Sequence, residues 1–492
     1  MSISTPLKTT TLARIFCFIV IVAWSISHVP FLSADADHHG PQQSRGSWTD
    51  EGLYAGQIRN YLNNNQFNIL ESDALIKTPL YSACLVVPFK VFETSQEVAR
   101  ASVVCIVMLS LLLFVFFQHF RLALILFLST TLLFFSVREY SHLSLPEMCA
   151  VAMILIAGLA FVQHQKTKQY HFITACFIFL FAAVLFKVQF IYLLVIPSVC
   201  IFLANAYERK KIVDKSFFTS LLYVIGIIGL LYGAFYLPLK NEFDFIATMQ
   251  SGTYTMDTIS YDYFKQNIEY KFFDAEHILF TSCFLLALVI ALWSMIKKSI
   301  PESMSALMLF TFVWILVELH KLPMSYLPVR YLISTYVAMG LFTSLTFAHV
   351  FTTKCSWVLK TSIAVLIIVL VYTNTKNYID TYNRRTFAIA QVNAYLAATA
   401  TKNKIMIGPW APTLTWQSKS ISFPIWKDFL TTKTPLKTFK PSVVISEYNE
   451  DDSGEAYRNL GINLAACSDS IKEVSIAYWK INIYWINQDS LK

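Results

Sequence analysis

Residues 15–33 read Ile15-Phe-Cys-Phe-Ile-Val-Ile-Val-Ala-Trp-Ser-Ile-Ser-His-Val-Pro-Phe-Leu-Ser33, an apolar run that contains no acidic residue, lysine or arginine. The hydrocarbon core of a bilayer is crossed by about 20 apolar residues of helix, so this run predicts a membrane span. Lys8 and Arg14 precede the run, and Ser33-Ala-Asp-Ala36 loosely resembles a signal-peptidase site. We interpret the run as an uncleaved first span, because many similar runs follow. Either interpretation leaves the next segment outside the cytoplasm.

The composition of the whole chain also indicates a membrane protein. Of its 492 residues, 55% are hydrophobic and only 14% are charged, and the mean hydropathy is +0.51. A soluble domain averages about 25% charged residues. The net charge of +8 does not indicate nucleic-acid binding, because the basic residues fall mainly in short clusters between apolar runs. The nine cysteines form no CxxC motif and no metal-ligand spacing.

Further apolar runs predict about eleven spans, centred on 15–33, 98–118, 122–137, 148–163, 172–186, 188–205, 217–236, 278–296, 303–319, 331–351 and 357–373. With the N-terminus inside, the predicted cytoplasmic loops carry the basic clusters Arg121, Lys166, Lys168, Arg209, Lys210, Lys211, Lys215, Lys297, Lys298 and Lys354. This distribution follows the positive-inside rule. The predicted fold is therefore an all-α polytopic membrane domain over residues 1–373, with its N-terminus in the cytoplasm.

Two segments outside these spans have their own patterns. Residues 79–92 are apolar but reach only about 21 Å as a helix, too short for a core of about 30 Å. We expect a helix at the outer interface that Pro88 kinks or ends. The tail, 374–492, combines a helix-like stretch (376–401) with short strand patterns at 404–408, 441–446 and 474–486. It predicts a small extracytoplasmic α/β domain.

The first outer loop, 34–97, contains an acidic pair in Trp48-Thr-Asp50-Glu51. The apolar positions after it follow helical spacing, which predicts an amphipathic surface helix: Tyr54, Ile58, Tyr61 and Leu62. Asp50 can be interpreted as the N-cap of this helix, or as part of a functional carboxylate pair. The same outer face is predicted to hold several more charged residues: Lys77, Arg138, Glu139, His142, Glu147, Lys187 and Arg330. This gathering on one face favours the functional interpretation.

These motifs resemble the GT-C superfamily of integral-membrane glycosyltransferases, in particular protein O-mannosyltransferases and lipid A aminoarabinose transferases. Asp50-Glu51 is similar to their Asp-Glu motif, and Lys77-Thr-Pro-Leu-Tyr81 to the Lys/His-Pro-Pro-Leu-Tyr element that follows it. Glu147 takes the place of a second loop carboxylate, and Arg330-Tyr331 resembles the Arg-Tyr that opens a late span. The resemblance covers roughly residues 10–350. Thr78 replaces the first proline, and Glu147 stands where aminoarabinose transferases have aspartate.

The resemblance implies transfer of a sugar from a polyprenyl-phosphate donor to a hydroxyl or phosphate group on a lipid, glycan or protein. The expected location is the outer face of a bacterial inner or plasma membrane. Asp50 is assigned as the base for an inverting attack, with Glu51 completing the catalytic pair. The residues assigned to the donor phosphate are Lys77, Lys187 and Arg330. Those expected to position substrate are Tyr54, Arg59, Tyr81, Arg138, His142, Glu147 and Tyr331.

No cofactor is expected, because cations can neutralise the leaving phosphate. A divalent metal on Asp50, Glu51, His142 and Glu147 is an alternative that we do not favour. A transporter or flippase is the main alternative function, but the sequence has neither mid-span charges nor internal repeats. A polysaccharide polymerase or ligase of the cell envelope usually has its main loop late in the chain, whereas the acidic motif here follows the first span.

Overall fold

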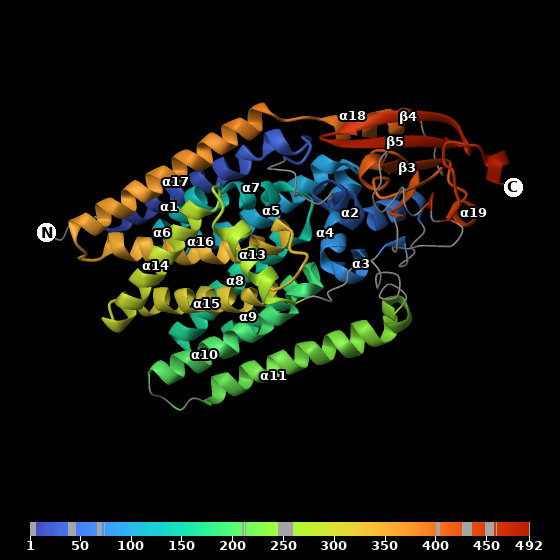
Figure 1. Cartoon of the computed structure of the whole chain (residues 1–492). Helices are drawn as coiled ribbons and strands as arrows, with labels where there is room; N and C mark the ends of the chain where they lie inside the picture. Colours follow the sequence, from blue (N-terminus) through green and yellow to red (C-terminus); the bar gives the residue numbers. More distant parts are fainter. Residues whose placement is uncertain are drawn as a thin grey trace.

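The structure is a computed structural model, and it describes residues 6–37, 46–65, 71–72, 74–208, 211, 213–244, 259–399, 404–425, 435–447, 457–458 and 460–491. Helices run side by side in a bundle, and a small sheet lies beyond one end of it (Figure 1). The helices of the bundle include α1 (Pro6–Ser27), α5 (Gln96–Val115), α8 (Pro146–Thr167), α9 (Tyr170–Phe186), α10 (Ile196–Tyr207), α11 (Lys215–Leu230), α14 (Ile278–Ile296), α15 (Glu302–Glu318), α16 (Val329–Thr352) and α17 (Trp357–Asn383).

The helical part also includes α2 (Gly46–Asn64), α3 (Ala74–Lys77), α4 (Pro79–Phe92), α6 (Arg121–Phe127), η4 (Leu128–Leu132), α7 (Phe135–His142), η5 (Val188–Val195), α13 (Tyr261–Phe272), η8 (Leu319–Lys321), α18 (Ala388–Thr399), η9 (Thr413–Thr415) and α19 (Pro435–Phe439). The 14-residue helix α4 matches the predicted short helix, but it does not end at Pro88 and continues to Phe92.

The described residues contain nine helices that are long and apolar enough to cross a membrane. The bent pair Gln118–Leu132 and Phe135–His142, with 91° between its halves, makes a tenth if it is one span. Helix α9 is apolar but shorter, with 17 residues, and it stands where another span was predicted. The chain is therefore an integral membrane protein that crosses the bilayer many times, and the count of eleven stays a prediction.

Three of the described basic loops lie at the same end of the bundle. The connections α10–α11, α14–α15 and α16–α17 are at the left of Figure 1, near the N-terminus and opposite the sheet. They carry Lys211, Lys297, Lys298 and Lys354. Arg209 and Lys210 of the same predicted cluster lie outside the described residues. This arrangement agrees with the sidedness predicted from charge, while the N-in orientation itself stays a prediction.

The C-terminal domain contains a five-stranded sheet in the order β2-β1-β3-β5-β4. Its strands are β1 (Ile405–Ile407), β2 (Ile421–Phe423), β3 (Val443–Glu447), β4 (Ser468–Ile476) and β5 (Trp479–Ile486). Strand β1 pairs in parallel with β2 and β3, whereas β5 pairs antiparallel with β3 and β4. The small α/β domain is thus confirmed. Strand β2 was missed, because it spans only three residues in a serine-rich segment.

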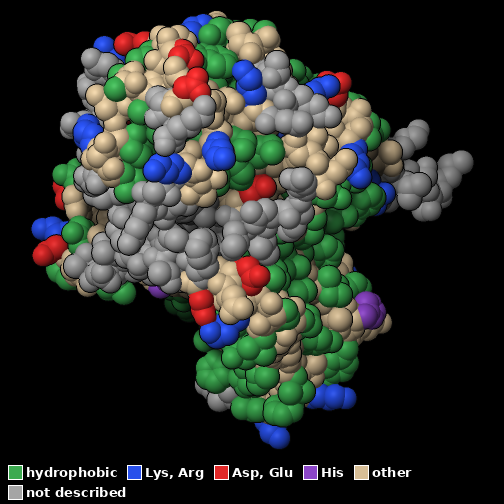
Figure 2. Space-filling model, turned by 90° about the vertical axis from the view of Figure 1, so that its right-hand side faces the viewer, with side chains coloured by type: hydrophobic (Ala, Val, Ile, Leu, Met, Phe, Trp, Pro, Cys, Tyr) green, Lys and Arg blue, Asp and Glu red, His purple; other side chains and the backbone are tan. Residues whose placement is uncertain are grey.

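Figure 2 looks onto the end of the molecule that carries this domain. Charged side chains are scattered over the upper part, whereas the lower part is mostly hydrophobic, with Lys or Arg side chains at its lower edge. A surface of that kind suits lipid, because hydrocarbon solvates apolar side chains and leaves charges unsatisfied.

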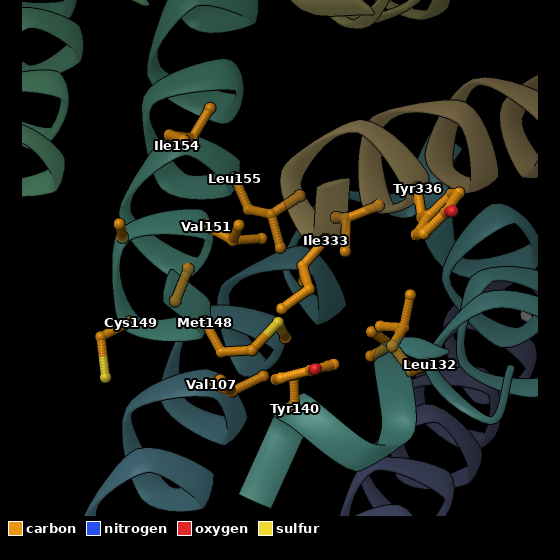
Figure 3. Close-up of a cluster of buried hydrophobic side chains, with 14 of the residues drawn as sticks. Val107, Leu132, Tyr140, Met148, Cys149, Val151, Ile154, Leu155, Ile333 and Tyr336 are labelled. Carbon is orange, nitrogen blue, oxygen red and sulfur yellow. The ribbon is translucent and has the colours of Figure 1, made fainter. Parts of the chain in front are cut away.

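A cluster of buried apolar side chains joins α5, η4, α7, α8 and α16 (Figure 3): Val107, Leu132, Tyr140, Met148, Cys149, Val151, Ile154, Leu155, Ile333 and Tyr336. Lipid is as apolar as these side chains, so close packing holds the helices together more than expulsion of water does. The cluster lies next to the first turns of α8 and α16. Those turns carry Glu147 and Arg330, and the packing therefore fixes the backbone positions of both residues.

Candidate active site

Asp50 lies in the second turn of α2, because the helix already begins at Gly46. The N-cap interpretation of Asp50 is therefore wrong. Its carboxylate forms an ion pair with Arg330, which stands in the first turn of α16. A helix dipole disfavours a cation in that turn, so Arg330 depends on the carboxylate for its stability. The buried Nε of Arg330 has no hydrogen-bond partner within the described part of the chain.

A second ion pair, between Lys187 and Glu147, adjoins the first. Lys187 stands at the break between α9 and η5, and Glu147 in the first turn of α8, where the dipole favours a carboxylate. The Tyr331 ring links the two pairs: its centroid is 5.1 Å from Lys187 Nζ and 5.3 Å from Arg330 Cζ. Lys187 Nζ also lies 5.6 Å from the Tyr54 ring centroid. Through these contacts the Tyr331 ring connects five predicted site residues: Lys187 and Arg330 directly, and Glu147, Tyr54 and Asp50 through those two cations.

Lys321, at the end of η8, adds a third buried pair through Glu318. Its Nζ donates to the backbone carbonyl of Tyr331 over 2.9 Å, which ties this pair to the first two. Glu318 also accepts hydrogen bonds from Tyr192 (3.0 Å) and Ser334 (2.7 Å). Lys321 was not predicted as a site residue, because it follows a span and belongs to no motif. The sequence feature that could have indicated Lys321 is its position directly after an apolar run, on the predicted outer face.

Glu51 points to a different partner, Arg100 of α5. The guanidinium Nε and Nη2 lie 2.8 and 2.6 Å from the two carboxylate oxygens, a bidentate pair with both side chains fully buried. Arg100 Nη1 also donates to the carbonyls of Phe31 (2.7 Å) and Ala34 (2.5 Å). Glu51 thus fastens α2 to α5 and to the segment after the first span. Arg100 was not predicted as a site residue, because it lies at the beginning of an apolar run that was interpreted only as a membrane span.

The carboxylates of these ion pairs differ in solvent exposure. The Asp50 side chain is 15% exposed, whereas those of Glu51, Glu147 and Glu318 are at most 1% exposed. An incoming molecule can therefore touch Asp50 without the rearrangement that the other three would require.

Two tyrosines and one lysine complete this side of α2. The pKa of the Tyr54 phenol is well above its ordinary value, because the ring is buried and lies near the carboxylates of Glu147 and Asp50. Tyr54 therefore stays protonated at neutral pH. The Tyr81 hydroxyl forms a 2.5 Å hydrogen bond with Ser144. Lys77 ends the short helix α3 and is half-buried. A hydrogen bond from Leu75 N to Gln57 Oε1 (2.7 Å) connects α3 to α2.

Arg138 and His142 belong to a second buried cluster, between α1, α7 and α17. Arg138 Nη2 donates to Thr381 Oγ1 over 2.8 Å, and Thr381 donates to Asp37 Oδ2 over 2.8 Å. The His142 ring lies 5.4 Å from the ring of His28, centroid to centroid. In the described contacts, Arg138 and His142 meet each other here and do not meet the pair of Asp50 and Arg330.

Arg59 faces the C-terminal domain. Its guanidinium donates to the carbonyls of Thr415 and Ser420 and to the hydroxyl of Ser422, and it is fully buried. Burial lowers the pKa of Arg59 to about 10. Nearby, burial raises the pKa of Glu71 to about 7, although the side-chain amide of Asn60 donates to it over 2.9 Å.

In the ranges that the structure describes, no group of three or more His, Cys, Asp or Glu side chains is placed to hold a metal ion.

No protein-family model matches the chain, and no curated protein is significantly similar to it in sequence. Its fold does match solved structures. ArnT from Cupriavidus metallidurans in the apo state aligns with a TM-score of 0.61 and 14% identity, over 96% of this chain and 98% of that chain. The same protein bound to undecaprenyl phosphate aligns over the same shares, with a TM-score of 0.57 and 14% identity.

The oligosaccharyltransferase of Archaeoglobus fulgidus, in complex with Zn and sulfate, aligns with a TM-score of 0.50 and 12% identity, over 87% of this chain and 68% of that chain. ArnT, a lipid A aminoarabinose transferase, and the oligosaccharyltransferase are both GT-C glycosyltransferases. The chain therefore has the GT-C fold, as the short motifs predicted.

Proposed function

We propose that this protein is a membrane glycosyltransferase that takes its sugar from a polyprenyl-phosphate donor and transfers it to a hydroxyl acceptor. The GT-C fold supports the class of reaction, and the binding of undecaprenyl phosphate by ArnT supports the class of donor. The proposed location of the site is the outer face of the membrane, beside an extracytoplasmic C-terminal domain. Residues 1–373 form the proposed catalytic domain and 374–492 the accessory one.

The observation that carries this proposal is the meeting of buried cations with one accessible carboxylate. Arg330 and Lys187 converge on Tyr331, and Arg330 is paired with Asp50. Buried cations near a membrane boundary are costly, which makes them a sign of function. A phosphodiester needs charge neutralisation as it leaves, and two or three fixed cations provide it.

In the proposed reaction, Asp50 accepts the proton of the acceptor hydroxyl. The hydroxyl oxygen attacks the anomeric carbon of the sugar from the side opposite the phosphate. The new C–O bond forms while the bond from that carbon to the phosphate oxygen breaks, and the polyprenyl phosphate leaves with the electron pair. Arg330, Lys187 and Lys77 stabilise the growing charge on the phosphate, and the configuration at the carbon inverts.

The ion pair of Asp50 with Arg330 gives this mechanism an order of events. A donor phosphate that engages Arg330 competes with Asp50 for the same guanidinium. Asp50 then loses part of its stabilising charge and becomes a stronger base. Glu51, held by Arg100, supports the helix that carries Asp50. Tyr54, Tyr331 and Glu147 form the walls around the sugar and phosphate.

The test is a transfer assay in membranes with a panel of radiolabelled polyprenyl-phosphate sugars. We expect one donor to label a lipid, glycan or protein fraction, and Asp50→Asn to reduce the rate about 100-fold or more. Asp244→Asn is the matched control, because Asp244 pairs with Lys240 on the exposed surface. It should transfer at the wild-type rate. A wild-type rate for Asp50→Asn would show that Asp50 is not the base.

The same membranes separate the proposal from a flippase. A flippase would move a labelled lipid-linked sugar between leaflets without breaking the bond between sugar and phosphate. Recovery of intact donor from the opposite leaflet, with no labelled product and no free polyprenyl phosphate, would refute transferase activity.

A further inference from the structure

One face of α2 lies against the C-terminal domain along its whole length. Near the start of the helix, Thr413 of η9 donates its hydroxyl to the carbonyls of Trp48 and Thr49, at 3.1 and 3.0 Å. These carbonyls immediately precede Asp50 in the chain. A side-chain hydroxyl from the accessory domain therefore holds the backbone beside the proposed base.

The next turn of α2 is in direct backbone contact with the same segment. A Cβ added at Gly52 would lie 2.3 Å from the amide nitrogen of Thr413 and 2.5 Å from the carbonyl carbon of Pro412. Only a residue without a side chain permits this approach, because backbone atoms cannot give way as a flexible side chain can. One turn later, a Cβ at Gly56 would lie 3.5 Å from the Pro412 side chain.

The far end of α2 is anchored by buried polar groups. Arg59 donates to the carbonyls of Thr415 and Ser420, and Asn60 Nδ2 donates to the carbonyl of Ser422 over 2.9 Å. The guanidinium of Arg59 is fully buried, and hydrogen bonds from a charged donor are stronger than those between neutral groups, so the contact is not a weak surface docking.

The segment that makes these contacts is itself held rigidly. Asn393 of α18 donates to the Thr413 carbonyl over 3.0 Å and accepts from the Trp416 amide over 2.6 Å. Trp416 and Trp410 are fully buried, so neither presents its ring to a sugar. Another side of α2 is held by the ion pair of Glu51 with Arg100.

We propose that the C-terminal domain is a positioning element of the active site, and that Thr413 is the residue through which it sets the place of Asp50. This inference rests on the proposed transferase function. The domain then has a role in the chemical step itself, beyond covering the membrane domain or binding the acceptor. A displacement of catalytic groups by about 1 Å can lower a rate about 100-fold, so a contact at residues 48 and 49 is close enough to matter.

The experiment replaces the Thr413 hydroxyl with a methyl group. Thr413→Val should lower kcat about 10- to 100-fold and leave the KM for donor unchanged, because it moves the base without touching the proposed phosphate-binding cations. Thr413→Ser, which restores the hydroxyl, should recover most of the activity. Thr415→Val is the matched control: Thr415 is equally buried, but its hydroxyl donates to Ala411 within its own segment (2.6 Å).

A second measurement does not depend on activity. Hydrogen–deuterium exchange of the intact protein in detergent should be faster at the α2 amides over residues 48–56 in Thr413→Val than in Thr415→Val. If the wild type transfers no sugar from any donor, the proposed function fails, and the exchange result alone decides the positioning inference. Equal kcat and equal exchange in the two valine variants would overturn the inference.

Discussion

The close contact at Gly52 makes a sharp prediction for Gly52→Ala. The new Cβ would meet backbone atoms of Pro412 and Thr413 at 2.3 to 2.5 Å, whereas an ordinary Cβ contact is 3.4 Å or longer. Helix α2 and the C-terminal domain must therefore separate by about 1 Å, and Asp50 lies only two residues away along the chain. A displacement of that size at a catalytic base predicts a fall in kcat of about 100-fold.

Gly56→Ala is the control for this prediction. Its Cβ would make an ordinary 3.5 Å contact with the Pro412 side chain. Both substitutions replace glycine by alanine inside the same helix, so both favour the helical state by up to about 1 kcal/mol. Any difference between them therefore reports the contact with the domain.

The assay is the initial rate of sugar transfer in membranes, divided by the amount of protein that elutes as a single folded species in detergent. We expect Gly56→Ala to equal the wild type and Gly52→Ala to elute normally but turn over slowly. Equal rates for the two variants would refute the reasoning, because the 2.3 Å approach would then have no effect on the site.

Two further predictions concern buried charges at the edges of the site. Burial raises the pKa of Glu71 to about 7, so the folded protein holds a proton that the unfolded chain loses above about pH 4.5. The resulting stabilisation is fully present below pH 4.5 and is lost as the pH rises to 7. It amounts to about 3 kcal/mol at most, and Glu71→Gln should abolish this part of the pH dependence of thermal unfolding. Arg100→Met leaves Glu51 buried without a counterion and should cost about 3–5 kcal/mol in unfolding free energy, much of which Glu51→Gln should restore in the double variant. If the losses of unfolding free energy in Arg100→Met and Glu51→Gln simply add in the double variant, the ion-pair argument is contradicted. If thermal unfolding of the wild type and of Glu71→Gln depends on pH in the same way, the Glu71 prediction is contradicted.

The sequence predicted the parts of the site that lie at the ends of apolar runs. Glu147, Lys187 and Arg330 each interrupt or open a hydrophobic segment on the same side. In the structure Lys187 and Arg330 both contact the Tyr331 ring, and Glu147 forms an ion pair with Lys187. A charged side chain beside an apolar run is easy to find in a sequence. Because a charge is costly to bury in a membrane, it usually either has a function or snorkels to the interface.

Partner choice within the site could not be predicted in this way. Asp50 and Glu51 are neighbours in sequence, but consecutive helical residues point in directions about 100° apart, so one faces Arg330 and the other faces Arg100. Arg138 was grouped with Asp50 on topology alone, whereas it packs beside Thr381 of α17. Sidedness fixes the end of the bundle at which a residue lies, and only the lateral packing of helices fixes its neighbours.

The balance of charge among the three buried pairs has a consequence for turnover. Arg330, Lys187 and Lys321 are each matched by one carboxylate. A cavity with unopposed cations would bind a departing phosphate monoester, with its higher negative charge, more tightly than the diester that entered. In the proposed reaction, the carboxylate beside each of these three cations competes with the spent lipid carrier for its contacts, so the carrier can diffuse away into the bilayer.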